Sequence, residues 1–531
     1  MQNAPNSSRH VTQNWIVRKP AVHTAGGLVT SQSRLAAEAG ASVLSDGGNA
    51  VDAAVAAGFA LAAVEPWNSG LGGIGYMLVW VARERRAYVV DFGPISPARL
   101  DPRDFPLVDG AAGDLFSWPA VAEERNLHGA LSIAVPGEVD GLGLALERFG
   151  SWPLARVLEP AIAHADAGLP VDWYTTLRVS FYARELARYA NAAAIWLPDG
   201  LPPISTQGTP LKRIVLGALP QTLRRLAKAG RRDFYTGELA RALVADIAAA
   251  GGVLDAGDLA RYRANIRAAD HLVHRGVTLH LSGALSAAPT LAASLKALAL
   301  RTLGRGAPGP DAFLAYAETL SAAYAERLAT LGDESVARAP VCTTHLNAVD
   351  RDGNMVALTQ TLLSVFGAKV ISPSTGILLN NGVMWFDPRP GRPNSLAASK
   401  RPLTNMCPVL GTKNDTPWLA IGASGGRKIM PAGMQIISFL ADFGMDLESA
   451  FHAPRIDASG EPAIGVDPRL PAEAIAALSA RFPVHLTEHV VLPTNFACPC
   501  AILVDPQTGA RTGIADVMSP WSAAVAAGDV Q

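Results

Sequence analysis

Charge and cysteine are both scarce in this chain. Only 17% of the 531 residues are charged, and 45 Lys and Arg against 46 Asp and Glu leave a net charge of −1. No block of basic residues is present, so the sequence lacks the electrostatic footprint of a nucleic-acid-binding protein, and we exclude nucleic acid as the main partner. Apolar residues make up 49%, an ordinary globular composition that argues against extended disorder.

Long apolar runs are also missing. The longest informative one, Ala53–Val64, is too short to cross about 30 Å of hydrocarbon, so it predicts a buried helix and no membrane partner. Residues 1–10 are polar, and no apolar segment typical of a secretory signal follows them before Ala21. We therefore expect a cytoplasmic protein.

The four cysteines do not form a C-x-x-C pair. Cys498 and Cys500 are closer in sequence than zinc ligands usually are. We expect free thiols, no metal site and no other cofactor.

The chain is long enough for three or four domains. No repeat or low-complexity linker divides it, so we interpret it as one large body. Alanine-rich segments ended by Gly or Pro predict helices at 49–64, 223–229 and 239–250, within a largely helical region from 30 to 300.

Strand patterns occur in three predicted hairpins. These pair residues 76–81 with 87–92, 343–349 with 355–361, and 501–504 with 510–514. The second is the strongest, because Asp350–Asn354 supplies turn residues that tolerate left-handed backbone. Helices in one half and hairpins at both ends favour antiparallel sheets sandwiched by helices.

The glycine-rich segment Gly70–Gly75 fits the dinucleotide pattern G-x-G-x-x-G. That chemistry requires a strand before the loop and a helix after it, so that pyrophosphate meets a helix N-terminus. Here a helix is predicted before and a strand after. We therefore interpret this segment as a close-packed loop.

The segment Gly422–Gly426 fits G-x-S-x-G, with a predicted strand at 418–421 before it and a helix at 430–443 after it. Ser424 could therefore be the nucleophile of a serine esterase. The candidate acid and base residues are Asp457 or Asp467 with His485 or His489. The upstream chain, however, lacks the regular strand and helix alternation of such a fold.

A longer set of segments occurs in a fixed order. The central stretch runs from Val341 to Asp350 and continues through Asp352–Asn354, Thr359–Thr361 and Gly376–Asn381. Others are Gly47–Ala54, Gly70–Met77, Pro136–Gly137, Leu158–Ile162, Phe234–Gly237, Lys400–Leu403, Gly422–Gly426 and Ala453–Arg455. Together they cover most of residues 25–520 and resemble the gamma-glutamyltransferase family of N-terminal nucleophile hydrolases.

This resemblance implies a proenzyme that cleaves itself between Cys342 and Thr343. Residues 1–342 would form a mostly helical large subunit and residues 343–531 a small subunit that begins at the nucleophile. Together they would build one α+β body, a four-layer αββα sandwich. The expected partners are then the two subunits of one precursor and a small acyl amide substrate.

The implied chemistry places nucleophile and base in one residue. The Thr343 hydroxyl attacks the preceding carbonyl, and hydrolysis of the resulting ester frees the Thr343 amine. An α-amino group titrates near 7.7 to 8.0, so at neutral pH it can accept the hydroxyl proton. The resemblance also assigns Thr361 to support this amine, and the backbone N–H groups of Gly425 and Gly426 to the oxyanion.

The glutamyl-binding positions of the family are altered here. Its arginine falls at Gly93, its asparagine at Leu363, its Gln and Asp at Gly382 and Trp385, and its Ser-Ser pair at Thr404 and Asn405. An unpaired buried charge costs several kcal/mol, so a γ-glutamyl head group would be poorly held.

These replacements predict an amidase or acyltransferase for another acyl amide, as in the family's cephalosporin-acylase-like branches. Arg389, Arg392 and Arg427 could meet an acidic substituent, or could be solvated loop charges. Two alternatives stay open: the serine esterase, and a relative that folds but never matures, for which Cys342 before the cleavage position is a hint.

Overall fold

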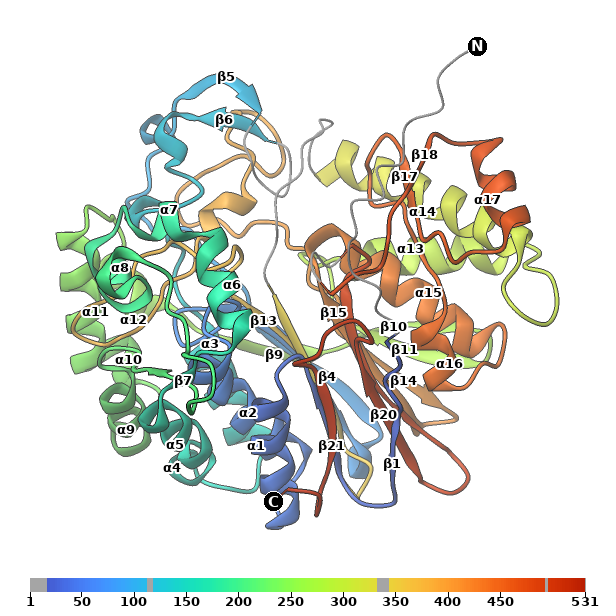
Figure 1. The fold of residues 1–531 in the computed structure, drawn as a ribbon, viewed down its shortest axis with the longest axis horizontal. Helices are drawn as coiled ribbons and strands as arrows, with labels where there is room; N and C mark the ends of the chain where they lie inside the picture. The colour runs from blue at the N-terminus through green and yellow to red at the C-terminus, as the bar shows by residue number, and fades with distance from the viewer. Residues whose placement is uncertain (1–16, 112–117, 332–342, 492–494, 531) are drawn as a thin grey trace.

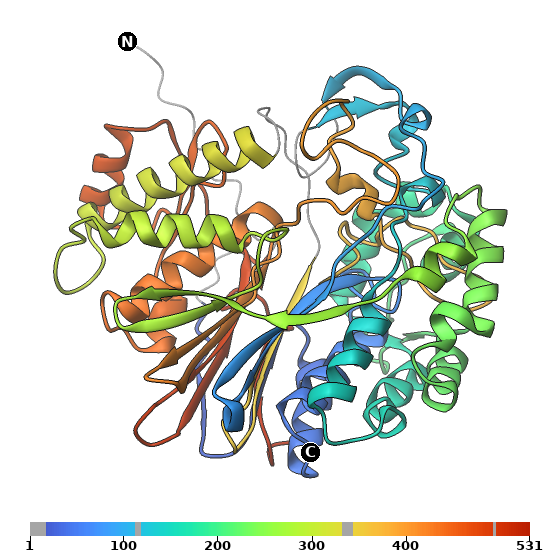
Figure 2. The same cartoon turned by 180° about the vertical axis from the view of Figure 1, so that it is seen from behind.

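Two large sheets lie face to face in the middle of the molecule, and helices cover the outer face of each (Figure 1 and Figure 2). The computed structural model describes residues 17–111, 118–331, 343–491 and 495–530. The predicted α+β fold, a four-layer αββα sandwich, is confirmed. Both sheets are antiparallel, which separates this fold from the parallel sheet of an α/β-hydrolase.

Sheet A has seven strands in the described residues, in the order β1-β20-β19-β15-β14-β11-β10. They are β1 (Val22–Thr24), β20 (Arg511–Ala515), β19 (Cys498–Val504), β15 (Thr416–Ser424), β14 (Val409–Lys413), β11 (Val277–Leu281) and β10 (Asp270–His274). The predicted hairpin near the C-terminus is confirmed as β19 and β20.

Sheet B also has seven described strands, in the order β21-β2-β12-β13-β3-β4-β9. They are β21 (Ala523–Ala526), β2 (Leu28–Ser31), β12 (Thr344–Val349), β13 (Met355–Thr361), β3 (Ile74–Val81), β4 (Arg86–Phe92) and β9 (Asn265–Ala268). The other two predicted hairpins are confirmed as β3–β4 and β12–β13. Each sheet contains strands from both sides of Thr343.

The first twelve helices lie outside sheet B, on the left in Figure 1. They are α1 (Arg34–Ser45), α2 (Ala50–Val64), α3 (Glu138–Phe149), α4 (Leu154–Val157), α5 (Glu159–Ala167), α6 (Trp173–Phe181), α7 (Ala183–Leu186), α8 (Ala190–Trp196), α9 (Leu219–Ala229), α10 (Asp233–Thr236), α11 (Glu238–Ala249) and α12 (Ala256–Arg261).

The later helices lie outside sheet A, on the right in Figure 1. They are α13 (Ala288–Ala299), α14 (Pro310–Leu331), α15 (Ile429–Ala441), α16 (Leu447–His452) and α17 (Ala472–Ser479). The small sheets are β5–β6 (Leu107–Ala111, Pro119–Val121), β7–β8 (Leu169–Pro170, Arg213–Ile214) and β16–β17–β18 (Ile456–Asp457, Ile464–Val466, Val484–Leu486).

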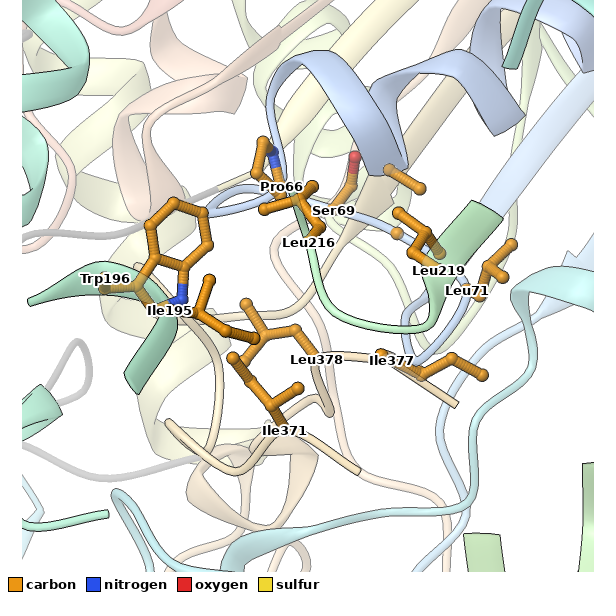
Figure 3. A pocket seen from close by; sticks show the side chains of 13 residues that line it. Pro66, Ser69, Leu71, Ile195, Trp196, Leu216, Leu219, Ile371, Ile377 and Leu378 are labelled. Carbon is orange, nitrogen blue, oxygen red and sulfur yellow. The ribbon is translucent and has the colours of Figure 1, made fainter. Parts of the chain in front are cut away.

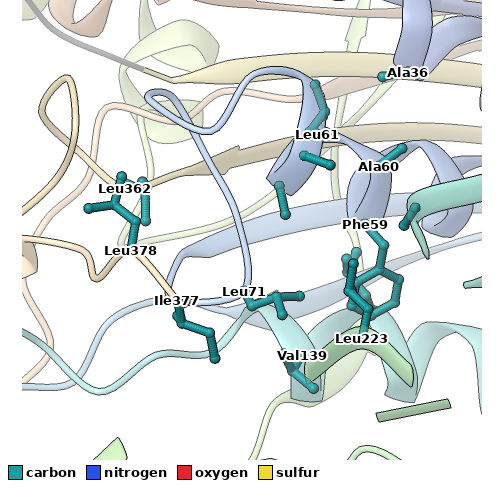
Figure 4. Close-up of a cluster of buried hydrophobic side chains, with 14 of the residues drawn as sticks. Ala36, Phe59, Ala60, Leu61, Leu71, Val139, Leu223, Leu362, Ile377 and Leu378 are labelled. Carbon is teal, nitrogen blue, oxygen red and sulfur yellow. The ribbon is translucent and has the colours of Figure 1, made fainter. Parts of the chain in front are cut away.

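Helix α2 is the buried helix that the run Ala53–Val64 predicts. Asn49 caps its N-terminus by accepting bonds from the backbone of Val51 and Asp52, and Asp52 bonds back to Asn49. Every residue of the helix is buried, and Phe59 packs toward Val139 and Leu223 of other helices (Figure 4). Small alanine side chains let the helix lie close to sheet B.

The loop at Gly70–Gly75 packs closely, as its sequence context predicts. It joins α2 to β3, and a Cβ at Gly72 would lie 2.2 Å from the Leu378 carbonyl oxygen. A side chain there would therefore collide with backbone.

The sequence pattern missed strands inside the region that it marks as largely helical. Strands β9, β10 and β11 lie between residues 265 and 281; β9 is an edge of sheet B, β10 is an edge of sheet A, and β11 is the neighbour of β10. They are short and amphipathic, so their period-2 signal is weak beside the alanine-rich helices. No helix in the described residues is long and apolar enough to cross a membrane.

Candidate active site

Thr343 stands at the head of β12, in the middle of sheet B. Its hydroxyl lies 3.4 Å from the Thr361 hydroxyl, and both side chains are buried. Thr344 pairs with Gln360 in the β12–β13 register, so Thr343 and Thr361 are the next opposed pair and point to the same face. Thr361 Oγ1 also accepts a bond of 2.7 Å from the Leu363 backbone N–H, which fixes its orientation. The structure thus brings the two predicted threonines together.

Contacts between the sheets place Thr343 opposite the end of β15. Farther down β12, Asn347 donates a bond of 3.0 Å to the Cys500 carbonyl, which pairs with Gly422. Gln32, which follows β2 beside β12, accepts a bond from Ser424. The two strands therefore run in opposite directions at this contact: the end of β12 nearest Thr343 lies across from the end of β15 at Ser424. Gly425 and Gly426 come next, at about the level of Thr343.

Glycine is required at this turn. Gly425 and Gly426 have φ values of 127° and 60°, which side-chain-bearing residues seldom adopt. A Cβ at Gly425 would also lie 2.9 Å from the Ala497 Cα atom. The turn leads through the 3₁₀ segment Gly426–Lys428 into α15, so the positive end of a helix dipole faces this edge of the sandwich.

His345 anchors the head of β12, although the sequence analysis gave it no role. Its Nε2–H donates to Asn347 Oδ1 at 3.0 Å, and the Thr359 hydroxyl donates to its Nδ1 at 2.8 Å. The ring lies against Gly422, where a Cβ would come within 2.3 Å. Burial lowers the pKa of His345 to about 4, so the imidazole is neutral at neutral pH. Its role here is structural, because it holds β12 against its neighbours through these bonds.

Among the described residues, the hydroxyl of the alternative nucleophile Ser424 is bonded to Gln32 and not to a histidine. Ser424 Oγ donates a bond of 2.9 Å to Gln32. His489 instead lies 3.5 Å from Asp516, and Asp467 pairs with Arg469. Gln32 cannot accept the proton of a serine nucleophile, so this geometry does not support a Ser–His–Asp triad.

Leu363 and Trp385 belong to one apolar cluster, which reaches the candidate nucleophile through the bond of Leu363 to Thr361. Both are buried in the cluster between the two sheets, together with Met384 and Met406. Leu363 has a φ of 84°, which is rare for a branched side chain and marks a constrained turn directly after Thr361. Most atoms of these side chains are carbon or sulfur, and the buried Trp385 Nε1–H has no hydrogen-bond partner among the described residues.

Gly93 faces the guanidinium of another arginine. A Cβ at Gly93 would lie 2.6 Å from Arg401 Nη2 and 3.0 Å from the Tyr76 hydroxyl. Arg401 is paired through both terminal nitrogens with Asp91. Burial disfavours its charged form, but this pair outweighs that effect and raises the pKa of Arg401. A cation from a distant loop therefore lies beside Gly93, with its charge balanced by Asp91.

Gly382 is held in a tight backbone approach. A Cβ there would lie 2.7 Å from the Ala134 Cβ atom and 3.3 Å from the Pro94 Cβ atom. Its N–H donates to Asn380 Oδ1 at 2.8 Å. The space of a side chain at this position is therefore already filled.

Thr404 and Asn405 are held by a buried arginine of α14. Arg327 donates to the Thr404 carbonyl at 2.8 Å and to Asn405 Oδ1 at 3.2 Å. Thr404 Oγ1 donates to the Leu285 carbonyl at 3.0 Å. Because Arg327 has no acceptor, it fixes the Asn405 amide oxygen toward itself. Sequence spacing gave no signal for Arg327, which lies in a different layer.

The three candidate arginines differ in position, and Arg427 alone of them adjoins the glycine turn, directly after Gly426. Arg389 pairs with Asp387, and Arg392 is exposed. The Arg427 carbonyl accepts a bond from Tyr324. Cys342, the residue before the predicted cleavage position, lies outside the described residues.

A small apolar hollow opens on the helix side of sheet B. Leu71, Ile195, Trp196 and Leu378 line it, with Ser69 at its edge (Figure 3). It lies behind the sheet face that carries Thr343. Across the described ranges, His, Cys, Asp and Glu do not form a cluster of three or more that could hold a metal ion.

Comparisons with known proteins agree along nearly the whole chain. The gamma-glutamyltranspeptidase family model matches residues 36–342 and 337–526. An acylase ACY 1 proenzyme from Pseudomonas sp. (strain V22) is 32% identical over 524 residues, covering 90% of each chain. A glutathione hydrolase proenzyme from Escherichia coli (strain K12) is 30% identical over 486 residues, covering 81% of this chain and 80% of that one.

A solved structure shares the fold. The cephalosporin acylase from Bacillus halodurans superposes with a TM-score of 0.83 over 99% of both chains, at 24% identity. The family model, the two relatives and the four-layer sandwich give one answer. The chain belongs to the gamma-glutamyltranspeptidase family of N-terminal nucleophile hydrolases.

Proposed function

We propose that this chain is a self-processing amidohydrolase or acyltransferase whose nucleophile is Thr343. The observation that carries the proposal is the position of Thr343 at the head of β12, with its hydroxyl 3.4 Å from that of Thr361. The proenzyme names of the relatives also support a precursor that is cleaved into two subunits. The family model matches in two parts that meet at residues 337–342, which supports a boundary between residues 1–342 and 343–531.

Processing and catalysis use the same hydroxyl. In the precursor, Thr343 Oγ1 attacks the carbonyl carbon of residue 342, and the peptide nitrogen leaves to become the Thr343 amine. Water then hydrolyses the ester and releases the carboxyl group of residue 342. In the mature enzyme, this amine accepts the hydroxyl proton as Oγ1 attacks a substrate amide, and the proton passes to the leaving amine.

Gly425 and Gly426 are the proposed oxyanion donors. Charge develops on the carbonyl oxygen during attack, and rigid backbone N–H groups stabilise it without reorganisation. The acyl-enzyme ester is then opened by water in hydrolysis or by a second amine in transfer. Thr361 holds the Thr343 side chain in place, through the bond that Leu363 fixes.

The acyl group that fits is not γ-glutamyl. Leu363 and Trp385 present an apolar wall, and the charge of Arg401, the cation beside Gly93, is balanced by Asp91. A free α-carboxylate and α-ammonium would meet no unbalanced counter-charge among these groups. We propose an acyl amide whose acyl chain is uncharged where it meets Leu363 and Trp385, with Thr404 and Asn405 at the polar end.

Intact-mass spectrometry and N-terminal sequencing test the nucleophile. Wild type should give fragments of 342 and 189 residues, the smaller beginning Thr-Thr-His-Leu. Thr343→Ala should stay full-length and inactive, whereas Thr343→Ser keeps a hydroxyl and should still be cleaved. A folded, active wild type that stays in one piece would refute the assignment. A panel of γ-glutamyl, glutaryl and aliphatic amides then tests the acyl group.

A further inference from the structure

The two faces of the catalytic strand meet different surroundings. Thr343 and Thr361 face the space between the sheets. The next opposed pair, Thr344 and Gln360, faces the helices, because strand side chains alternate. Each member of this second pair meets a buried carboxyl group. Gln360 Nε2 donates to Glu138 Oε1 at 3.0 Å, and the Thr344 hydroxyl lies beside Glu65.

Glu65 occupies the C-terminal end of α2 and is 4% exposed. Its Oε2 atom and the Thr344 Oγ1 atom are both buried, and neither has a hydrogen-bond partner among the described residues. The Thr344 hydroxyl is nevertheless close enough to the Glu65 carboxyl group to favour its ionised form. Two polar atoms are left over at the head of the catalytic strand, where the cost of an unsatisfied group is high.

The charged and titratable groups around Glu65 come from several elements. Arg178 approaches from α6 and has a partner in Tyr174, whose hydroxyl accepts its Nη2–H at 2.6 Å. Asn68 comes from the loop after α2, and the thiols of Cys498 and Cys500 come from β19. Burial raises the pKa of both thiols, so they stay neutral. Arg178 is thus the counter-charge that faces Glu65 in the described structure.

We infer that Glu65 is a positioning residue that tunes the α-amino group of Thr343, the base of the proposed reaction. This inference rests on the proposed function. The nitrogen of Thr343 is one residue from Thr344, whose side chain touches Glu65. When cleavage converts this nitrogen from an amide to an amine, a carboxylate across Thr344 stabilises the protonated form.

The sign of the effect follows from this charge. Burial raises the pKa of Glu65 to about 7, so the group ionises just below the range in which the amine loses its proton. The ionised carboxylate raises the pKa of the ammonium group. Since the base must be unprotonated, Glu65 moves the acidic limb of the kcat/KM profile to higher pH. The enzyme therefore has lower activity at acidic pH than it would have without this carboxylate.

Glu138 supplies a matched control. It is fully buried in the same layer and contacts the other member of the opposed pair, Gln360. Burial raises its pKa well above the usual value and so disfavours its charged form. Replacing Glu138 by Gln removes a carboxyl group in a comparable position whose charged form burial disfavours.

The experiment compares pH profiles of kcat/KM for wild type, Glu65→Gln and Glu138→Gln, each purified after cleavage, on one amide that wild type hydrolyses. Glu65→Gln should shift the acidic limb down by roughly half a unit or more, as expected for the loss of one nearby charge. On the limb it should then show about threefold more of its plateau rate than wild type. Glu138→Gln should leave the limb in place.

Mass spectrometry separates the two possible failures. If wild type is not cleaved before Thr343, the proposed function fails. If all three proteins are cleaved and active but their acidic limbs coincide, the role of Glu65 is overturned while the nucleophile stands. Equal shifts in both variants would also overturn it, because they would indicate a packing effect. A lower plateau with an unmoved limb counts against it in the same way.

Discussion

At the scale of single residues, Gly93 shows how a residue from a distant loop can occupy the space beside a position without a side chain. Position 93 is glycine, yet a guanidinium stands where its side chain would begin, supplied by Arg401. The pair of Arg401 with Asp91 keeps that charge balanced. Adding a cation at Gly93 should therefore cause a steric and electrostatic conflict and should not create a glutamyl site.

We expect Gly93→Arg to lower thermal stability and to leave γ-glutamyl amides unhydrolysed, because its Cβ would lie 2.6 Å from Arg401 Nη2. Combining it with Arg401→Ala should relieve the conflict. In a double-mutant cycle by urea unfolding, the pair should then be less unstable than the sum of the single changes by about 1 kcal/mol or more. Additive effects would show that the two positions do not compete.

The sequence motifs predicted the candidate nucleophile, but they did not predict the residues that surround it in the fold. Thr343 could be found because an ordered motif surrounds it. Arg401 and Asp91 are 310 positions apart, and Glu65 meets Thr344 only because α2 packs on sheet B. No local spacing encodes such contacts, since they depend on how whole layers stack.

At the scale of elements, the residues in the turns decide where catalytic groups can be placed. The hairpin β12–β13 was predictable from Asp350–Asn354, whose Asp350 carboxylate accepts the Asn354 N–H at 2.9 Å. The turn after β15 was also visible as a glycine-rich motif, but the motif alone fitted both a serine elbow and an oxyanion turn. The backbone φ values and the bond from Ser424 to Gln32 favour the second.

Replacing Gly425 by alanine should damage both stability and activity. Its φ of 127° and its contact with Ala497 predict a cost of about 1–3 kcal/mol, and the displaced N–H should lower kcat/KM about 100-fold. Gly433 in α15 is the control, because a Cβ there meets no atom within 4 Å. Gly433→Ala should stabilise the protein by about 0.5–1 kcal/mol in urea unfolding. Gly425→Ala behaving like Gly433→Ala would contradict the strain argument.

At the scale of the whole molecule, the sandwich is predictable as a class but its strand order is not. Alternation and turns located the main hairpins, and alanine-rich periodicity located the helices around α2. The placement of β12 between β2 and β13 joins residues about 300 positions apart. Such pairing is set by the fit of whole sheets, so a residue-by-residue reading could not supply it.

The interleaved sheets predict a difference in refolding. Wild type cleaved before Thr343 would have to reunite two chains after denaturation, whereas uncleaved Thr343→Ala would refold as one chain with a high effective concentration of its halves. Recovery of native structure by circular dichroism after dilution from urea should decrease as the final protein concentration is lowered, for the cleaved protein alone. Equal recovery of both proteins at every concentration would argue against this difference.

The position of β12 in the middle of sheet B means that the proposed cleavage would follow folding. Both neighbours of that strand must already be in place before its first residue can react, so chemistry at this bond would report that assembly has finished. Once the bond is broken, the two subunits can no longer refold along the pathway of the single-chain precursor. The lifetime of the native enzyme would then be set by its unfolding barrier, that is, by kinetic stability. A molecule that unfolds after cleavage would not regain its structure as the precursor does.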